Sequence, residues 1–281
     1  MTDIPFTDFG GTGAYVHFLH ANGYPPACYQ PLMRCLTHQY HVSAMHLRPL
    51  WPGSDPNGID AWQPLSDDYR LFQNQQKQNS VIAVGHSVGA VVLLRAALRD
   101  PARFKSLILI DPVIFQPSNI AAYNLIKAIG LANKYHPLIS GALNRRRRFD
   151  NLEKLQASYR RKQIFRYFSD EALKTYIAGI TRPAENDGFE LVYSPEWEAR
   201  IYYTGIWRDM DLWREFSSLK VPTLIIRGAE TDTFLNTTAK RLKRLRPQTT
   251  FITIEKSTHL VPLEKPEETY TTMQNFLTEN L

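Results

Sequence analysis

The sequence of 281 residues predicts an α/β protein, in which a mostly parallel β-sheet is flanked by helices and interrupted by an inserted helical segment. Short apolar runs typical of buried strands alternate with helical stretches up to residue 112 and again after residue 218. Between them, residues 113–218 contain few strand-like runs and many aromatic and basic side chains at helical spacing. We therefore predict a core formed by residues 1–112 and 219–281, and a helical cap or lid formed by residues 113–218.

The composition is that of an ordinary globular chain, since 43% of the residues are hydrophobic and 12% are aromatic. The net charge of +6 arises largely from basic runs at residues 145–148, 160–162 and 240–244. No signature of a nucleic-acid-binding module accompanies these runs, so we interpret them as solvated helix faces and expect no nucleic-acid partner. The two cysteines, Cys28 and Cys35, provide no disulfide framework.

The first ten residues lack the basic and apolar regions of a signal peptide. No apolar stretch approaches the ~18 residues that a membrane span needs. We therefore expect a cytoplasmic protein with no membrane span. A homodimer is compatible with the sequence.

Predicted strands and helices follow one another along the chain. The strands are expected at residues 15–20, 41–47, 81–84, 106–110, 221–227 and 250–254. The helices of the core are expected at residues 29–36, 62–75, 90–98, 236–245 and 266–277, and those of the cap at 119–131, 151–168 and 170–180. Because parallel strands bind ligands at their carboxyl ends, reactive residues should directly follow strands.

The turn after the strand at 81–84 carries a candidate nucleophile. It reads GHSVG (residues 85–89), with Ser87 at the apex and a glycine two residues away on each side. The glycines make room for a serine held in a strained conformation. The backbone N–H of Val88 begins the following helix, where it can donate to an oxyanion. We expect Ser87 to be the nucleophile and Val88 to supply one oxyanion-hole N–H.

A serine hydroxyl needs a neighbouring base, and histidine is the usual one. Of the eight histidines, His259 is the candidate because it follows the last predicted strand after a short loop. The histidine in turn needs a carboxylate that fixes its tautomer. We prefer Asp232, in the loop after the strand at 221–227, and Asp111, at the end of the strand before the cap, is the alternative. Ser87, Asp232 and His259 stand in the chain order of the nucleophile-elbow hydrolases.

A second oxyanion donor is expected in the loop ANGYPP (residues 21–26), which follows the first of these strands. The backbone N–H of Tyr24 is our choice. An ordinary turn is the alternative, since an Asn-Gly pair also favours turns.

Taken together, these motifs resemble the α/β-hydrolase superfamily of serine hydrolases over nearly the whole chain. The matching segments are HANGYP (20–25), GHSVG (85–89), Asp111-Pro112, residues 221–232 and Ser257-Thr258-His259. The resemblance implies an eight-stranded sheet with a helical cap, and hydrolysis through an acyl-enzyme with no cofactor and no metal.

Two positions depart from the pattern of the superfamily. The usual His-Gly before the oxyanion residue is Asn22-Gly23 here, which leaves the register of the oxyanion loop open by one or two residues. Asp232 lies four residues after Gly228, where many relatives have three. Thr231 then occupies the commoner position, which keeps the alternative of Asp111 open.

We predict a serine hydrolase of the carboxylesterase kind that acts on a small-molecule carboxylic ester through this triad. The same triad could transfer the acyl group to another acceptor, or cleave a lactone, a thioester or a carbon–carbon bond. A hydrolase scaffold without catalysis, serving to bind a ligand, is the less favoured alternative. The cap is expected to supply the pocket. Aromatic residues near its end are more typical of a cap core than of a substrate wall, namely Tyr202, Tyr203, Trp207 and Trp213.

Overall fold

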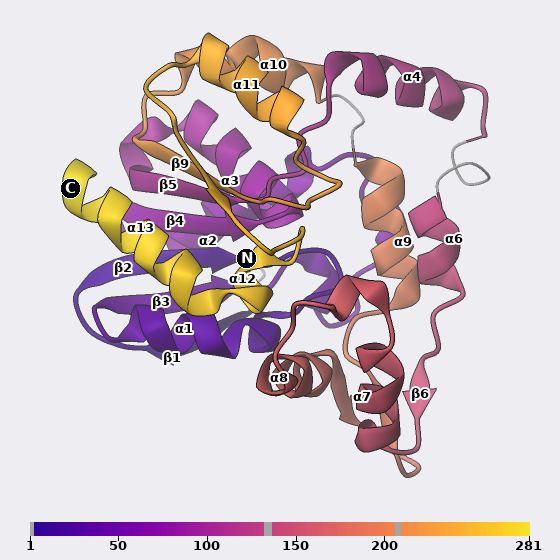
Figure 1. Ribbon diagram of the computed structural model, residues 1–281. Coiled ribbons are helices and arrows are strands. Elements are labelled where there is room, and N and C mark those ends of the chain that lie inside the picture. The colour runs from indigo at the N-terminus through magenta and orange to yellow at the C-terminus, as the bar shows by residue number, and fades with distance from the viewer. Residues whose placement is uncertain (1–2, 132–136, 206–208) are drawn as a thin grey trace.

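The computed structural model describes residues 3–131, 137–205 and 209–281, so Trp207 lies outside the described residues (Figure 1). Its centre is a seven-stranded sheet in the order β1-β3-β2-β4-β5-β9-β10, in which only β1 runs antiparallel to its neighbour. The α/β fold class is confirmed, with seven strands among the described residues where the resemblance implies eight. The strands are β1 (Phe6–Gly10), β2 (Ala14–Leu19), β3 (Tyr40–Met45), β4 (Val81–His86), β5 (Phe104–Ile110), β9 (Thr223–Gly228) and β10 (Thr250–Ile254).

The central strands are buried on both faces because their alternate side chains enter two different cores. In β4, Ile82 and Val84 pack on one face while Ala83 packs on the other. Helices α2 (Gln63–Gln75), α3 (Val88–Arg99) and α11 (Asn236–Leu245) belong to the core on the Ala83 side. Helices α1 (Gln30–Thr37), α12 (Val261–Glu264) and α13 (Pro266–Asn280) belong to the other, with α13 crossing in front of the sheet (Figure 1). Each fully buried aliphatic side chain contributes about 1.5–3 kcal/mol to folding.

Residues 113–218, here called the cap, separate β5 from β9 and lie largely to one side of the sheet (Figure 1). A three-stranded antiparallel sheet that the sequence analysis did not predict joins β6 (Arg148–Phe149), β8 (Phe189–Leu191) and β7 (Thr181–Pro183). The division into core and cap stays a prediction. The helices of the cap are α4 (Pro117–Ala128), α6 (Pro137–Leu143), α7 (Leu152–Arg160), α8 (Asp170–Ile180), α9 (Pro195–Thr204) and α10 (Met210–Glu215).

Three cap helices begin at side chains that cap them. Asn151, Ser169 and Ser194 accept the free backbone N–H groups at the starts of α7, α8 and α9. Each such cap stabilises its helix by about 1 kcal/mol. Among the described residues, no helix is both long enough and apolar enough to cross a membrane.

The strand register brings the loops of the site to one edge. His86 at the end of β4 pairs with Ile110 of β5, and Ile110 pairs with Ile226 of β9. Ser87 and Asp111 therefore follow paired residues of adjacent strands. The loop before His259 leaves β10 at the same edge, because Ile254 pairs with Gly228.

Three histidines are buried in or next to this sheet, and burial keeps each of them neutral. It lowers the pKa of His17 to about 4 and that of His20 to about 3. The pKa of His86 is also held well below its ordinary value, by burial first and by the neighbouring His259 second. The unfolded chain takes up a proton at each of these side chains below about pH 6.5, whereas the folded chain does not.

We expect the free energy of unfolding to fall as the pH drops from about 6.5 to 5.5, by about 1 kcal/mol for each of the three histidines. His17→Gln should reduce this pH dependence by about 1 kcal/mol, since one proton-binding difference is removed. The exposed His38, changed to Gln, is the matched control and should leave it unchanged. Urea unfolding across this pH range measures the slope, and an unaltered slope in His17→Gln would contradict the argument.

Candidate active site

Ser87 lies at the tight turn between β4 and α3 that the sequence predicts. Its backbone adopts φ 58° and ψ −121°, a strained conformation for a residue with a side chain. The turn requires glycine on both sides: a Cβ on Gly85 would lie 2.7 Å from the backbone of Ala90, and one on Gly89 would lie 2.4 Å from the carbonyl oxygen of Leu19. The residue is only 5% exposed.

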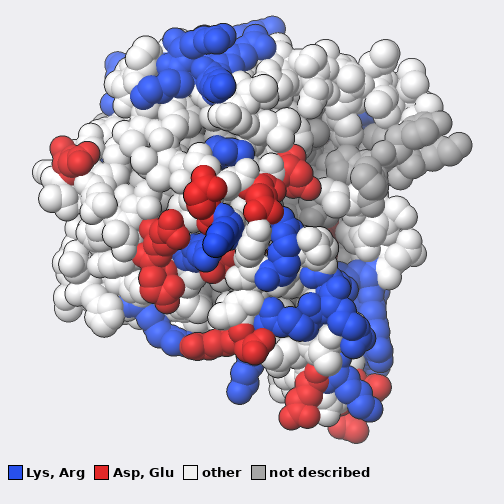
Figure 2. Space-filling model, in the orientation of Figure 1, with Lys and Arg blue, Asp and Glu red and all other residues white. Residues whose placement is uncertain are grey.

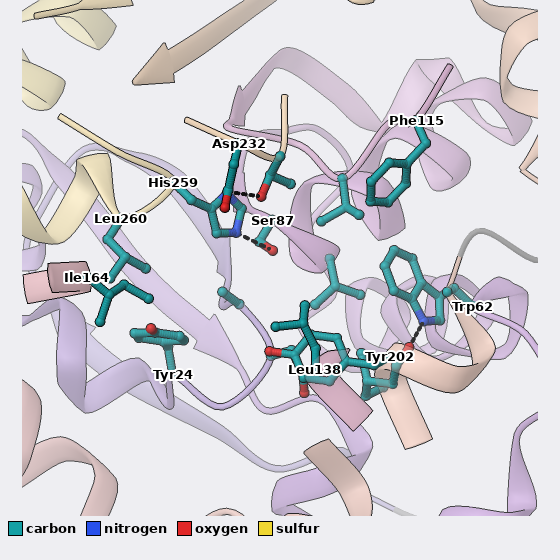
Figure 3. A pocket seen from close by; sticks show the side chains of 17 residues that line it. Tyr24, Trp62, Ser87, Phe115, Leu138, Ile164, Tyr202, Asp232, His259 and Leu260 are labelled. Atoms are coloured by element: carbon teal, nitrogen blue, oxygen red, sulfur yellow. Dashed lines mark hydrogen bonds between the residues drawn. The ribbon is translucent and has the colours of Figure 1, made fainter. Parts of the chain in front are cut away.

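His259 follows β10 and reaches Ser87. The distance from its Nε2 to Ser87 Oγ is 2.9 Å, as Figure 3 shows. Its Nδ1 lies 2.8 Å from Oδ1 of Asp111. An ionised carboxylate only accepts, so Nδ1 carries the proton and Nε2 is free to accept the serine hydroxyl. The imidazole is 22% exposed, which leaves it partly open to the cavity.

Asp111 is the buried carboxylate of the site, with no exposed surface. Besides the imidazole, it accepts the hydroxyl of Thr231 at 2.7 Å and the backbone N–H of Gly228 at 3.0 Å. Three donors therefore compensate for the removal of this charge from water. Its backbone is also strained, with φ 40°.

The structure corrects the expected contact between Asp232 and His259. The side chain of Asp232 is exposed, accepts a hydrogen bond from Thr233 Oγ1 at 3.2 Å, and makes none to the imidazole within the described residues. Thr231 holds the inner position of the loop, because its Oγ1 both accepts the N–H of Thr233 and donates to Asp111. Asp232 is one of the residues that line the cavity (Figure 3). The signal for Asp111 was its place directly after a strand.

Glu230, the other acid of this loop, binds the cap. It accepts Arg166 Nη2 at 2.7 Å and the hydroxyl of Tyr167. This contact joins the loop after β9 to the cap segment that includes Ile164, which lines the cavity. The exposed ion pair itself contributes little to stability.

The structure also changes the expected oxyanion donors. The backbone N–H of Tyr24 donates to the carbonyl of Ala21 at 3.2 Å and closes a turn, so it is not free to bind an oxyanion. Val88 begins α3 and lines the cavity, as expected. Asn22 lines the same cavity, and its backbone N–H has no hydrogen-bond acceptor among the described residues. Its side chain is fixed by Tyr193 Oη, which donates to Oδ1 at 2.9 Å. The loop sequence left this register open, and Asn22 was not predicted as a donor.

A buried relay joins the histidine loop to the oxyanion loop. Nε2 of His86 donates to the carbonyl oxygen of His259 at 2.7 Å, since a carbonyl only accepts. The other ring nitrogen therefore accepts the hydroxyl of Tyr29 at 2.8 Å. That hydroxyl accepts the backbone N–H of Ala21 at 3.1 Å. The low pKa of His86, which is a consequence of burial, keeps this tautomer neutral.

A cavity of about 210 Å³ opens over Ser87 and His259 (Figure 3). Most of its wall is apolar, and it comes from both core and cap. Trp62 is held in place by a hydrogen bond from Nε1 to the carbonyl of Ile201 at 3.1 Å. Tyr202 from the aromatic group near the end of the cap lines this cavity, whereas Trp213 is buried in a core cluster. Its apolar and aromatic lining residues are Ala21, Tyr24, Trp62, Val88, Val113, Phe115, Leu138, Ile164, Ile201, Tyr202 and Leu260.

The arrangement places a serine hydroxyl and the imidazole next to it in the wall of an apolar cavity, with a buried carboxylate behind the imidazole. Attack on an acyl carbon by a serine requires side chains of these three kinds. In the described part of the chain, no group of three or more His, Cys, Asp or Glu side chains could hold a metal ion.

Comparison with known proteins shows the family of the chain. The sequence model described as the alpha/beta hydrolase family matches residues 18–272. The chain belongs to the α/β-hydrolase family. A search of the curated proteins gives no match.

Several solved structures are similar in fold. E-2-(acetamidomethylene)succinate hydrolase has a TM-score of 0.75 at 20% identity, over 97% of this chain and 94% of the other. A thermophilic esterase from Thermogutta terrifontis has a TM-score of 0.69 at 19% identity, over 98% and 93%. A thioesterase domain from the curacin biosynthetic pathway has a TM-score of 0.75 at 15% identity, over 96% and 94%. At such identities the similarity concerns the fold alone.

Replacing the buried acid should slow the reaction of Ser87 with a fluorophosphonate probe. Asp111→Asn should reduce the labelling rate by about 10³–10⁴-fold, because an amide no longer favours the required imidazole tautomer. Asp232→Asn is the matched control and should stay within about threefold, since its exposed carboxylate is screened by water. A larger loss in Asp232→Asn than in Asp111→Asn would contradict the assignment.

Removing the hydroxyl of Tyr29 should disturb both loops of the relay. Tyr29→Phe leaves the N–H of Ala21 and the Nδ1 of His86 without partners, which should cost about 1–3 kcal/mol of stability. The folded variant should also label more slowly at Ser87. Tyr40→Phe, which loses a single hydrogen bond to Gln274, is the control. A folded Tyr29→Phe that labels at the wild-type rate would exclude a positioning role.

Proposed function

We propose that this protein is a serine hydrolase that cleaves a carboxylic ester with an apolar acyl or alcohol group. The observation that supports this most directly is the hydrogen-bonded row of Ser87, His259 and Asp111, which opens into a mainly apolar cavity. A small-molecule substrate fits a cavity of this size.

In the proposed mechanism, Nε2 of His259 takes the hydroxyl proton while Ser87 Oγ attacks the ester carbonyl. The backbone N–H groups of Asn22 and Val88 stabilise the resulting oxyanion. Asp111 stabilises the imidazolium, which then gives its proton to the leaving alcohol as the carbon–oxygen bond breaks. Water repeats the sequence on the acyl-enzyme, releases the acid and restores Ser87.

The apolar wall is the basis of substrate preference in this proposal. Trp62 and Phe115 lie on one side of Ser87 in Figure 3, and Tyr24 and Ile164 lie on the other. Burying an apolar group there contributes about 25 cal/mol per Å². We therefore expect esters with an apolar group that fills the cavity to react faster than esters of charged acids.

The test is hydrolysis of p-nitrophenyl esters of increasing acyl length by the wild type and by Ser87→Ala. We expect the wild type to favour short to medium chains, and the substitution to lower kcat by about 10⁴–10⁶-fold. Because one structural relative is a thioesterase domain, matched thioesters belong in the same series. Lactones as substrates, and alcohols or amines added as acyl acceptors, test whether the triad cleaves a lactone or transfers the acyl group.

Three outcomes separate the alternatives. Ester turnover that Ser87→Ala abolishes supports the proposal. Probe labelling of Ser87 without turnover of any ester indicates a different bond or a different acyl acceptor. Neither labelling nor turnover would overturn the enzyme assignment and favour a ligand-binding role.

A further inference from the structure

A second cavity, of about 380 Å³, lies in the cap and is strongly basic. Two basic runs of the sequence, 145–148 and 160–162, contribute to it from either end of α7. Figure 2 shows the Lys and Arg side chains that gather over this part of the molecule, at the lower right. The charged residues of its lining are Arg145, Arg146, Lys154, Lys162 and a single acid, Asp150.

Only part of this positive charge is neutralised within the protein. Arg145 pairs with Glu198 at 2.7 Å, and Arg146 pairs with Asp150 at 3.6 Å. In the described residues, neither of the lysines of this cavity lies within 4.0 Å of a carboxylate. The ammonium groups of Lys154 and Lys162 are therefore not paired with a carboxylate of the described part of the chain. Together they would balance the charge of one doubly charged anion.

The floor of the cavity carries a polar group that also has no partner. Tyr159 is only 7% exposed and lines the cavity, yet its hydroxyl makes no hydrogen bond within the described part of the chain. The ammonium of Lys162 lies 3.8 Å from the centre of the Tyr159 ring. Ser158, the residue before it, supplies a further hydroxyl to the lining.

The electrostatics of Lys162 agree with an uncompensated positive field. Its pKa is lowered, by partial burial first and by repulsion from Arg145 second. An anion in the cavity would offset both effects, because it would attract the ammonium form.

We propose that this cavity binds a phosphate group, either as the free anion or as part of an organic phosphate. Lys154 and Lys162 match its two charges, and the hydroxyls of Tyr159 and Ser158 donate to its oxygens. The volume exceeds that of one phosphate group, which leaves room for part of an organic molecule that carries it.

The position of the cavity relates it to the active site. The ring of Tyr176 lies 5.3 Å from that of Tyr24, which lines the catalytic cavity, and 6.1 Å from that of Tyr159, which lines the basic one. Arg145 also donates to Tyr176 Oη at 3.3 Å. A row of three tyrosine rings therefore connects the lining of one cavity to the lining of the other.

The experiment is calorimetric titration with inorganic phosphate at constant ionic strength, with chloride as the reference anion. We expect saturable binding of one phosphate, weakened about tenfold or more in the double variant Lys154→Gln/Lys162→Gln, because two charge-assisted hydrogen bonds are lost. Lys240→Gln, on the exposed basic face of α11, is the matched control and should bind as the wild type does. Absence of saturable binding, or equal binding by the folded double variant, overturns the proposal.

Two further variants show whether a loss of binding reflects misfolding and whether binding depends on the proposed active site. Tyr159→Phe removes only one hydroxyl and should weaken binding severalfold, so it replaces the double variant should that one not fold. Ser87→Ala should bind phosphate normally, which separates this site from the proposed ester hydrolysis. Tighter binding of phenyl phosphate than of inorganic phosphate identifies an organic phosphate as the ligand, and equal binding identifies the free anion.

Discussion

The arrangement of the site depends on the buried carboxylate of Asp111. A charge with no exposed surface is tolerated only where donors surround it, and here they come from three places. Gly228 and Thr231 donate from the loop after β9, and His259 donates from the loop after β10. Satisfying one carboxylate therefore fixes two loops against the end of β5, and it also sets the tautomer of the imidazole that faces Ser87.

A second buried group, the imidazole of His86, extends this constraint across the sheet. It connects the backbone of His259 through Tyr29 to the backbone of Ala21, next to Asn22. The base and the proposed oxyanion donor are thus held by one set of hydrogen bonds. Strained backbone conformations at Ser87 and Asp111 persist because packing and these hydrogen bonds determine the surrounding loops.

The cap supplies part of the wall of the cavity and also contacts the loop after β9. Its residues supply much of the apolar wall above Ser87, and the contacts of Arg166 and Tyr167 with Glu230 join it to the loop that also carries Thr231. The basic cavity is also lined by cap residues, and the row of tyrosine rings connects its lining to that of the catalytic cavity. Tyr24 lines the catalytic cavity, Tyr159 lines the basic one, and the ring of Tyr176 lies next to both.

Features that depend on a local pattern of residues could be predicted from the sequence. Apolar runs predicted the strands at the centre of the sheet, and the turn at Ser87 and the loop of His259 were found from glycine spacing and from their places after strands. Tertiary structure alone decided which carboxylate meets His259, because that depends on where the loop after β9 turns. Thr231, not Asp232, occupies its inner position.

The choice of oxyanion donor also depended on the tertiary structure, since the turn that engages the N–H of Tyr24 closes only in the folded chain. The short cap strands also escaped prediction, because two or three residues are too few to show a period.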